Sequence, residues 1–450
     1  HRRLLMHHRS FAASLLAVAL CAVPLASQDS ALAAPGTFVL RAAHLIDGTG
    51  AAEIQNGAVL VVGDSIVAVG TAASIKAPAG ARTIDLGDAT LLPGFIDAHV
   101  HLAGRELGDP EGDESAVHDY DQYSAILGVD HAKSTLLDGF TSVRNVGAPR
   151  FDDMALRKAI NDSQIWGPRM ENAGYAIGIT GGHCDDNGFK PGLMDGSIKT
   201  GIADGPEQVR AAVRYMVKEG ADVIKTCATG GVLSEGDAVG ASQYTYEELK
   251  AMVDEATKLG RKVAAHAHGT EGIKTAVRAG VSSIEHGSFL DAEGAKMMAA
   301  KGTYLVPTLS AGEAVEKAAN NGVLKGLRRQ KALDAAKAMR NAVKIARAAG
   351  VKIALGTDAG VGKHGTNAHE FTLMTTWGGM SPMESIVAGT SSGAKLLGWD
   401  EHVGSLAPGK WADIVAVPGD PLKDITNMEK ALFVMKGGAV YKTPAVALHP

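Results

Sequence analysis

Two consecutive stretches decide the fold: EQVRAAVRYMVKEGADVIKTCATGG (207–231) and TYEELKAMVDEATKLGRKVAAHAHG (245–269). Each begins with apolar residues at helical spacing, passes through a glycine and ends in a short apolar run. A helix followed by a strand, repeated at once, is typical of a parallel sheet whose strands are connected by helices. These stretches therefore predict an α/β fold.

The same alternation extends in both directions and predicts eight strands. They are GFIDAHVHL (94–102), FTSVRNVG (140–147), RMENAGYAI (169–177), ADVIKTCATGG (221–231), KVAAHAHG (262–269), SSIEHGS (282–288), TYLVPTLS (303–310) and VKIALGTDAG (351–360). Helical patterns such as residues 328–350 follow them. Eight such units predict a closed (β/α)8 TIM barrel. An open doubly wound sheet is the alternative, but no Gly-x-Gly-x-x-Gly follows the first strand.

Short β-branched runs with Asn-Gly and Gly-Asp turn signals occur at both ends of the chain, for example TFVLRAAHLIDG (37–48) and ALFVMKGGAVYKT (431–443). Such patterns are typical of antiparallel strands joined by tight turns. We expect a small β-sandwich domain built from residues 35–92 and 398–450, beside a barrel of residues 93–397.

Residues 1–34 do not have the pattern of a folded domain and are typical of a targeting segment. A basic segment (1–10), a short apolar run (14–26) and the small-residue site Ala31-Leu32-Ala33 have the order of a secretory signal peptide, residues 1–34. The apolar run is shorter than the roughly 20 residues that cross a bilayer, and no other segment is long and apolar enough. We expect an exported protein, periplasmic or secreted, without a membrane span.

Composition narrows the class of protein. The 450 residues are 46% hydrophobic and 21% charged, with a formal net charge of -5. This excludes a disordered chain and gives no electrostatic reason to expect nucleic acid as a partner. With 3 Cys, a disulfide scaffold is excluded too. Cys184 and Cys227 lie outside the leader, and we favour two buried thiols over a bridge.

Residues of metal-ligand type lie at the carboxyl ends of five predicted strands: His99, His101, Lys225, His266, His286 and Asp358. These ends of barrel strands converge on the active site. Residues two apart on a strand point to the same side, so His99 and His101 can reach one ion. One such histidine is more often structural, but the conjunction predicts a metal site.

Lys225 does not fit a ligand set as an ammonium, because a protonated amine has no lone pair. It follows Val223-Ile224, so burial would lower its pKa and free the amine for chemistry. A surface lysine is the alternative interpretation.

Other residues are weaker candidates for substrate binding: His183, Tyr244, His268, His364 and Arg144. For His183 and its neighbour Asp185, a structural turn is an equal alternative. Arg144 would bind a substrate carboxylate or pair with an acidic neighbour. His268 points to the same side of its strand as His266, which leaves the ligand in HAHG ambiguous.

Several sequence motifs together resemble those of a known protein family. LLPGFIDAHVHL (91–102), GTDAG (356–360) and GSLAPGKWADIVAV (404–417) resemble the amidohydrolase superfamily. GGHCD (181–185), KTCATGGV (225–232), HAHG (266–269), IEHGS (284–288) and HGTNAHE (364–370) resemble its exported branch related to imidazolonepropionase. That branch holds prolidase-like and Xaa-Arg-type metallo-carboxypeptidases and ochratoxin-hydrolysing amidohydrolases. Cys184 departs from the branch, where a small residue is expected.

The resemblance implies a role for each ligand. His99 and His101 would bind the more buried of two divalent metal ions, expected to be zinc. Lys225, carboxylated by CO2 to a carbamate, would bridge both ions. His266 and His286 would hold the second ion, and His268 would contact substrate. Asp358 would touch the first ion and act as general base and acid.

The activity that we expect is hydrolysis of an amide beside a free carboxylate, as in a dipeptide, an N-acyl amino acid or an ochratoxin-like amide. Hydrolysis of a cyclic amide, a lactone or a phosphotriester on the same centre is one alternative. A non-catalytic binding protein of this fold is another, but the six ligand positions are all filled by suitable residues. The family resemblance also suggests a homo-oligomer, for which an octamer has precedent.

Overall fold

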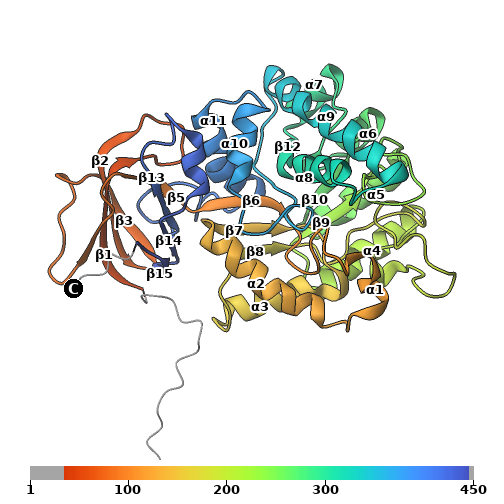
Figure 1. Ribbon diagram of the computed structural model, residues 1–450, viewed down its shortest axis with the longest axis horizontal. Coiled ribbons are helices and arrows are strands. Elements are labelled where there is room, and N and C mark those ends of the chain that lie inside the picture. The colour runs from red at the N-terminus through yellow and green to blue at the C-terminus, as the bar shows by residue number, and fades with distance from the viewer. Residues whose placement is uncertain (1–34, 445–450) are drawn as a thin grey trace, which may run out of the picture. The chain divides into compact units, whose positions relative to one another are not determined.

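The computed structural model describes residues 35–444, and the expected signal peptide lies outside them. The central part consists of parallel strands with helices packed around them (Figure 1). Its strands are β6 (Phe95–Val100), β7 (Phe140–Asn145), β8 (Arg169–Asn172), β9 (Val223–Cys227), β10 (Lys262–Ala267), β11 (Ser283–His286) and β12 (Tyr304–Val306). They pair in chain order within two parallel sheets, β6 to β8 and β9 to β12.

Backbone hydrogen bonds close the ring between these two sheets. On one side, Ile177 N donates to Lys225 O at 2.8 Å, and Cys227 N donates to Ile177 O at 3.0 Å. On the other, Ala354 N donates to Leu305 O at 3.0 Å, and Ala98 N donates to Leu355 O at 2.9 Å. The fold is therefore the predicted (β/α)8 barrel.

The eighth predicted strand, residues 351–360, differs from the expectation. It closes the ring through single bridges and is not a regular strand. Leu355 N donates to Ala388 O, at the start of the π-helical turn Ala388–Ser392, and so leaves the ladder. Asp358 then takes a left-handed backbone with φ of 59°. The hydrogen-bonding pattern is broken where the chain turns toward the cavity.

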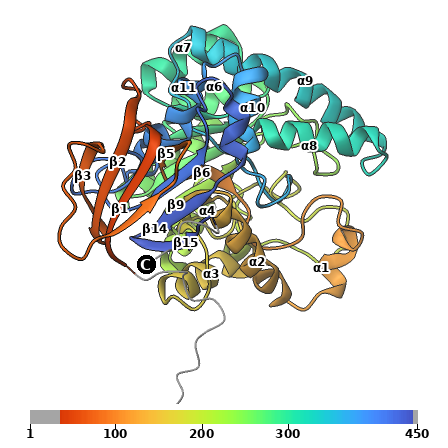
Figure 2. The ribbon, with the colours of Figure 1, turned by 60° about the vertical axis from the view of Figure 1, so that its left-hand side comes forward.

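The helices cover the outside of the ring (Figures 1 and 2). They are α1 (Ser115–His118), α2 (Tyr123–Leu137), α3 (Asp152–Asn161), α4 (Pro206–Glu219), α5 (Tyr246–Lys258), α6 (Thr270–Ala279), α7 (Ala292–Lys301), α8 (Leu309–Asn320), α9 (Gly326–Ala348), α10 (His369–Thr376), α11 (Pro382–Val387) and α12 (Gly393–Leu397). The three helices predicted from periodicity are α4, α5 and α9. Helix α5 begins with a capping box between Thr245 and Glu248. Helix α4 ends at Gly220, whose φ of 109° suits glycine.

Strands from both ends of the described chain form one further sheet (Figure 1). Its members are β1 (Gly36–Leu45), β2 (Ile54–Gly63), β3 (Ser65–Thr71), β4 (Arg82–Asp85), β5 (Ala89–Pro93), β13 (Ile414–Pro418), β14 (Phe433–Lys436) and β15 (Ala439–Lys442). The sheet folds around its own apolar core, which includes Phe38, Ile84 and Phe433, and forms the expected β-sandwich. It is not wholly antiparallel, because β4 and β5 run parallel to β1.

Within residues 35–444, the helices are all too short or too polar to cross a bilayer.

Candidate metal centre

The six predicted ligands line one cavity of about 190 Å³ at the carboxyl ends of the barrel strands. His183 and His268 line the same cavity. Polar residues at the ends of strands that are far apart in the sequence thus lie in one cavity, as the barrel geometry requires.

His99, His101 and Asp358 form the first group of potential ligands, with donor atoms within 4.8 Å of one another. Nε2 of His99 lies 3.4 Å from Oδ1 of Asp358, and Nε2 of His101 lies 3.3 Å from the same oxygen. The period of two along β6 places both imidazoles on one side, as predicted.

The opposite nitrogen of each ring is held by an acceptor. Nδ1 of His99 donates to Glu285 at 2.8 Å, and Nδ1 of His101 donates to Gly147 O at 2.9 Å. Because a carboxylate and a carbonyl can only accept, both rings carry their proton on Nδ1. The Nε2 lone pairs are therefore free for a metal ion, which is the usual arrangement of a ligating histidine.

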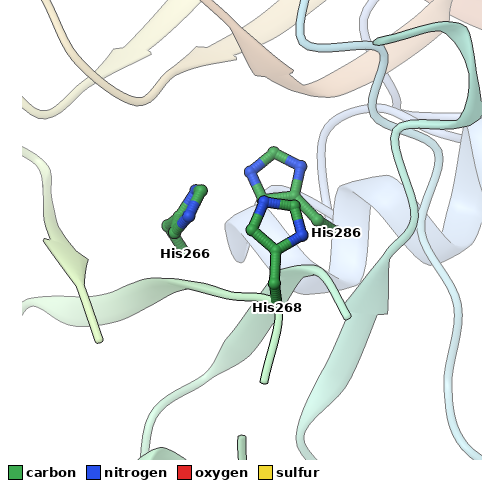
Figure 3. Close-up of side chains that lie close together, drawn as sticks. All are labelled: His266, His268 and His286. Atoms are coloured by element: carbon green, nitrogen blue, oxygen red, sulfur yellow. The ribbon is translucent and has the colours of Figure 1, made fainter. Parts of the chain in front are cut away.

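His266, His268 and His286 form the second group, again with donor atoms within 4.8 Å. Figure 3 shows the three rings gathered at the ends of β10 and β11. Nδ1 of His286 lies 2.7 Å from Oγ1 of Thr308, and Nδ1 of His268 lies 2.6 Å from Oγ of Ser288. The structure brings both histidines of HAHG into reach of one ion.

Burial keeps these rings neutral. It lowers the pKa of His266 and of His286 well below the ordinary value, and the neighbouring imidazoles add to the effect. Burial likewise lowers the pKa of His268 to about 3. A neutral imidazole offers a lone pair, which is the form that binds metal.

Three residues at or beside the cavity have a left-handed backbone. His286 has φ of 68°, Asp358 of 59° and Thr308 of 49°. Such values are uncommon for residues other than glycine, and they cluster at functional sites. At His286 the turn follows directly after Glu285, whose side chain reaches His99 in the barrel interior.

Lys225 is only 4% exposed, so the interpretation as a surface lysine is wrong. Its Nζ lies 3.4 Å from Nε2 of His99. Burial lowers the pKa of Lys225 to about 8, against the opposing charges of Glu285 and Asp358. The amine is therefore more easily deprotonated than an exposed lysine.

His183 lies beside the second group, with its ring centroid 4.2 Å from that of His266. Gly231 packs on this ring, since a Cβ at that position would lie 2.1 Å from it. Burial lowers the pKa of His183 to about 4. Its neighbour Asp185 accepts from Gly181 N at 2.8 Å, so Asp185 stabilises a turn.

Three weaker candidates lie outside the cavity lining. The hydroxyl of Tyr244 is buried and donates to Ala203 O at 2.8 Å. His364 stacks on His131 with centroids 4.2 Å apart. Arg144 donates to Ala98 O and to Glu285, and is 1% exposed. Of its two predicted roles, the structure shows the pairing with an acidic neighbour.

Cys184 and Cys227 form a disulfide, so the expectation of two free thiols is wrong. The sequence shows no reason for the pairing, because 43 residues separate the two positions. The bridge ties the segment after β8 to the end of β9, next to His183 and two residues from Lys225. Both cysteines line the cavity.

Sequence reasoning missed the residues that hold the ligands. Glu285 stands beside His286, and strand alternation places neighbouring residues on opposite sides, so the sequence shows no sign of its contact with His99. Glu370 is fully buried and accepts from Leu309 N and Ser310 N at the start of α8, next to Thr308. A fully buried carboxylate needs partners, but only the fold shows which ones.

A (β/α)8 barrel with a β-sandwich of terminal strands and two groups of potential metal ligands is typical of a class of metal-dependent hydrolases. The profile of the amidohydrolase family matches residues 90–440, and the chain belongs to that family. It is a hydrolase that acts on amide bonds.

The relatives confirm the expected branch. The chain is 35% identical to ochratoxinase of Aspergillus niger over 437 residues, which cover 91% of this chain and 87% of that protein. It is 27% identical to imidazolonepropionase of Cutibacterium acnes, covering 83% of this chain and 89% of that protein. The crystal structure of a Xaa-Pro dipeptidase with bound methionine in its active site superposes with a TM-score of 0.86 and 39% identity, covering 90% of this chain and 100% of that one.

Proposed function

We propose that the protein is a binuclear metal-dependent amidohydrolase that cleaves an amide beside a free carboxylate. Its substrates would be dipeptides, N-acyl amino acids or ochratoxin-like amides. One observation carries the proposal: two groups of potential ligands and the buried Lys225 face one cavity in a chain of the amidohydrolase family.

The residues present fit two divalent ions, for which we propose zinc. His99, His101 and Asp358 would hold the first, and His266 and His286 the second, with His268 left to contact substrate. Imidazole and carboxylate are suitable donors for zinc, with other transition ions as competitors. Bound there, the ions would polarise the substrate carbonyl and acidify the attacking water.

Lys225 would complete the centre as a carbamate. Its neutral Nζ attacks the carbon of CO2 and loses a proton to solvent, which leaves an N-linked carboxylate with two oxygens. The buried amine with its lowered pKa supports this step, because only the unprotonated form is nucleophilic. As a carbamate, Lys225 would be an anion with oxygen donors, whereas a protonated lysine would have no lone pair for a metal ion.

Asp358 is the proposed general base and acid. Its Oδ1 lies within 3.4 Å of Nε2 of both His99 and His101, at the centre of the first group. The carboxylate would take a proton from the attacking water and deliver it to the leaving nitrogen. That delivery is needed because an amine leaves poorly as an anion.

The substrate class is supported by the relatives. The name Xaa-Pro dipeptidase describes hydrolysis of a dipeptide, whose second residue has a free carboxylate, and that structure holds methionine in its active site. The name ochratoxinase describes action on ochratoxin. In this chain, His183 and His268 are the cavity residues that could donate a neutral N–H to a carboxylate.

A panel of Xaa-Xaa dipeptides and N-acyl amino acids, assayed with zinc present, tests the function. We expect turnover that a chelator abolishes and zinc restores. Lactones, cyclic amides and phosphotriesters serve as comparison substrates. Turnover of these alone would contradict the carboxylate-bearing amide, and activity that is unchanged by chelation would contradict the metal centre.

The carbamate has a separate test in metal uptake. Apoprotein should bind zinc poorly in CO2-free buffer and fully after bicarbonate is added, whereas Lys225→Ala should show no such dependence. Lys436→Met is a matched control, because burial also lowers the pKa of Lys436 to about 8 in the sandwich sheet. Uptake independent of bicarbonate in the wild type would contradict the carbamate.

We further propose export and a homo-oligomer. The disulfide between Cys184 and Cys227 supports export, because such bonds persist mainly in oxidising compartments. Sedimentation of the purified protein tests the assembly.

A further inference from the structure

The cavity that holds the candidate ligands has an apolar wall. The helical hairpin of α8 and α9 and the loop after β9 contribute only apolar residues to its lining. These include Val232, Ala311, Gly312, Val315, Ala335 and Met339. Figure 2 shows α8 and α9 side by side. The cavity is thus lined by candidate ligands on one part and by apolar residues of these two helices on another.

The wall has its own packing. Val232, Val315 and Ala335 belong to an apolar cluster of α8, α9 and the loop after β9, distinct from the main barrel core. The cluster is completed by Ala318, Ala319, Leu324 and Ala332. Val232, Val315 and Ala335 can thus be changed outside the main barrel core, whereas Met339 belongs to that core.

A buried lysine holds the loop in place. Lys331, on α9 and 4% exposed, donates to Ser234 O at 2.8 Å and to Oδ1 of Asp237 at 2.9 Å. Asp237 also accepts from Gly231 N at 3.3 Å, next to Val232. These contacts place Val232 against the hairpin before any substrate arrives, so the wall is preorganised.

The space suits a group of limited size. The whole cavity measures about 190 Å³, and an apolar cavity of about 150 Å³ is enough for a benzene molecule. Gly312 leaves room for Met339, since a Cβ there would lie 3.0 Å from the sulfur. A charged group at the wall would lose its hydration without gaining a partner.

We propose that this wall is a specificity subsite, which selects amides with a bulky apolar side chain, aliphatic or a single ring, beside the scissile bond. The inference rests on the proposed function and names the substrate class within it. Glycine, aspartate and lysine at the same position would be poor substrates.

Two substrate series test the subsite. One varies the amino acid in N-acetyl-glycine, -leucine, -methionine, -phenylalanine, -aspartate and -lysine, and the other varies the acyl group on glycine. In the series that varies the group bound by the subsite, kcat/KM should rise more than about 100-fold from the smallest to the best apolar group. Each methylene in a hydrophobic pocket changes kcat/KM by about 10–200-fold. Flat profiles in both series would overturn the subsite.

Variants of the wall give the second test. Ala335→Phe should lower kcat/KM for the best apolar substrate by at least about 10-fold more than for the smallest substrate. Met339→Ala should shift the optimum to a larger group. Met298→Ala is the matched control, because Met298 is equally buried in α7 but does not line the cavity. Loss of preference in the control alone would overturn the assignment.

Binding separates this inference from the proposed function. Calorimetry with zinc-loaded Asp358→Asn protein compares N-acetyl-phenylalanine with N-acetyl-glycine. Preferential binding of the apolar probe that Ala335→Phe abolishes supports the subsite even when wild-type protein hydrolyses neither compound, in which case only the function fails. Equal binding of both probes and of phenylacetyl-glycine, which carries the ring on the acyl side, overturns the subsite, whatever the turnover.

Discussion

Nδ1 of His99 donates to Oε2 of Glu285 at 2.8 Å, across 186 positions of the sequence. The other oxygen of the carboxylate accepts from Arg144 at 2.9 Å, and His99 and Glu285 are at most 1% exposed. Burial alone would raise the pKa of Glu285, but the charge of Arg144 and the hydrogen bond from His99 bring it to about 2. An ionised carboxylate buried in the barrel thus orients His99, a candidate metal ligand.

Replacement of Glu285 by Gln should weaken zinc binding by about 10–100-fold, the usual cost of losing such a partner. The amide can turn an N–H toward Nδ1 of His99 and so favour the wrong tautomer. Competition with a chelator measures the affinity. Glu255→Gln is the control, because Glu255 is also buried and paired with an arginine, Arg214. Equal affinity in both variants would show that Glu285 does not position the ligand.

Asp358→Asn should lower kcat by about 10²–10⁴, the range for loss of a general acid–base group. The amide oxygen can still face the first ion, so zinc content should stay close to that of the wild type. Steady-state kinetics and elemental analysis of the same sample check both statements. A variant that keeps its metal and most of its activity would remove Asp358 from the mechanism.

Replacing Cys184 and Cys227 together by Ala should lower the free energy of unfolding by about 4 kcal/mol on the loop-entropy account, for the 43-residue separation. Urea denaturation with and without a reductant measures this. Reductant should destabilise the wild type and leave the variant unchanged. An equal response of the two proteins would mean that the bond does not form in solution.

Glu171 should make stability depend on pH. It is 6% exposed, and burial raises its pKa to about 7 against the opposing charges of Arg144 and Lys262. The folded protein therefore holds this proton more tightly than the unfolded chain, whose Glu titrates near pH 4.3. Its contribution to stability is complete below about pH 4 and is lost as pH rises through about 7.

The Gln variant of Glu171 has no proton to lose at this position. Compared with the wild type, Glu171→Gln should gain about 3–4 kcal/mol of relative stability between pH 4 and pH 8. Urea denaturation of metal-free protein at both pH values measures the difference. A difference that is independent of pH would show that Glu171 is ionised throughout.

The local sequence pattern was sufficient to predict the features that depend on residues only a few positions apart. Alternation of helices and strands predicted the barrel, and the period of two placed His99 and His101 on one face. The position of Lys225, His266, His286 and Asp358 at strand ends predicted one shared cavity, because barrel geometry brings these ends together.

Other expectations were wrong where a contact with a residue far away in the sequence determines the role of a side chain or the pairing of a strand. Tyr244 was a candidate for substrate binding, but its hydroxyl donates to Ala203 O; for Arg144, the structure shows the second of its two predicted roles, pairing with an acidic neighbour, Glu285. The eighth strand was lost from the ladder because Leu355 N bonds to Ala388 O. Pairing of Cys184 and Cys227 was not expected either.

The sequence by itself determined which residue types stand at the strand ends, because periodicity and turn chemistry act over a few positions. Only the tertiary structure decided which side chains orient them, such as Glu285 on His99, and which helices line the cavity with apolar groups. Those choices depend on hydrogen bonds and packing between segments that are far apart in the chain, and buried polar groups must find such partners wherever the fold offers them.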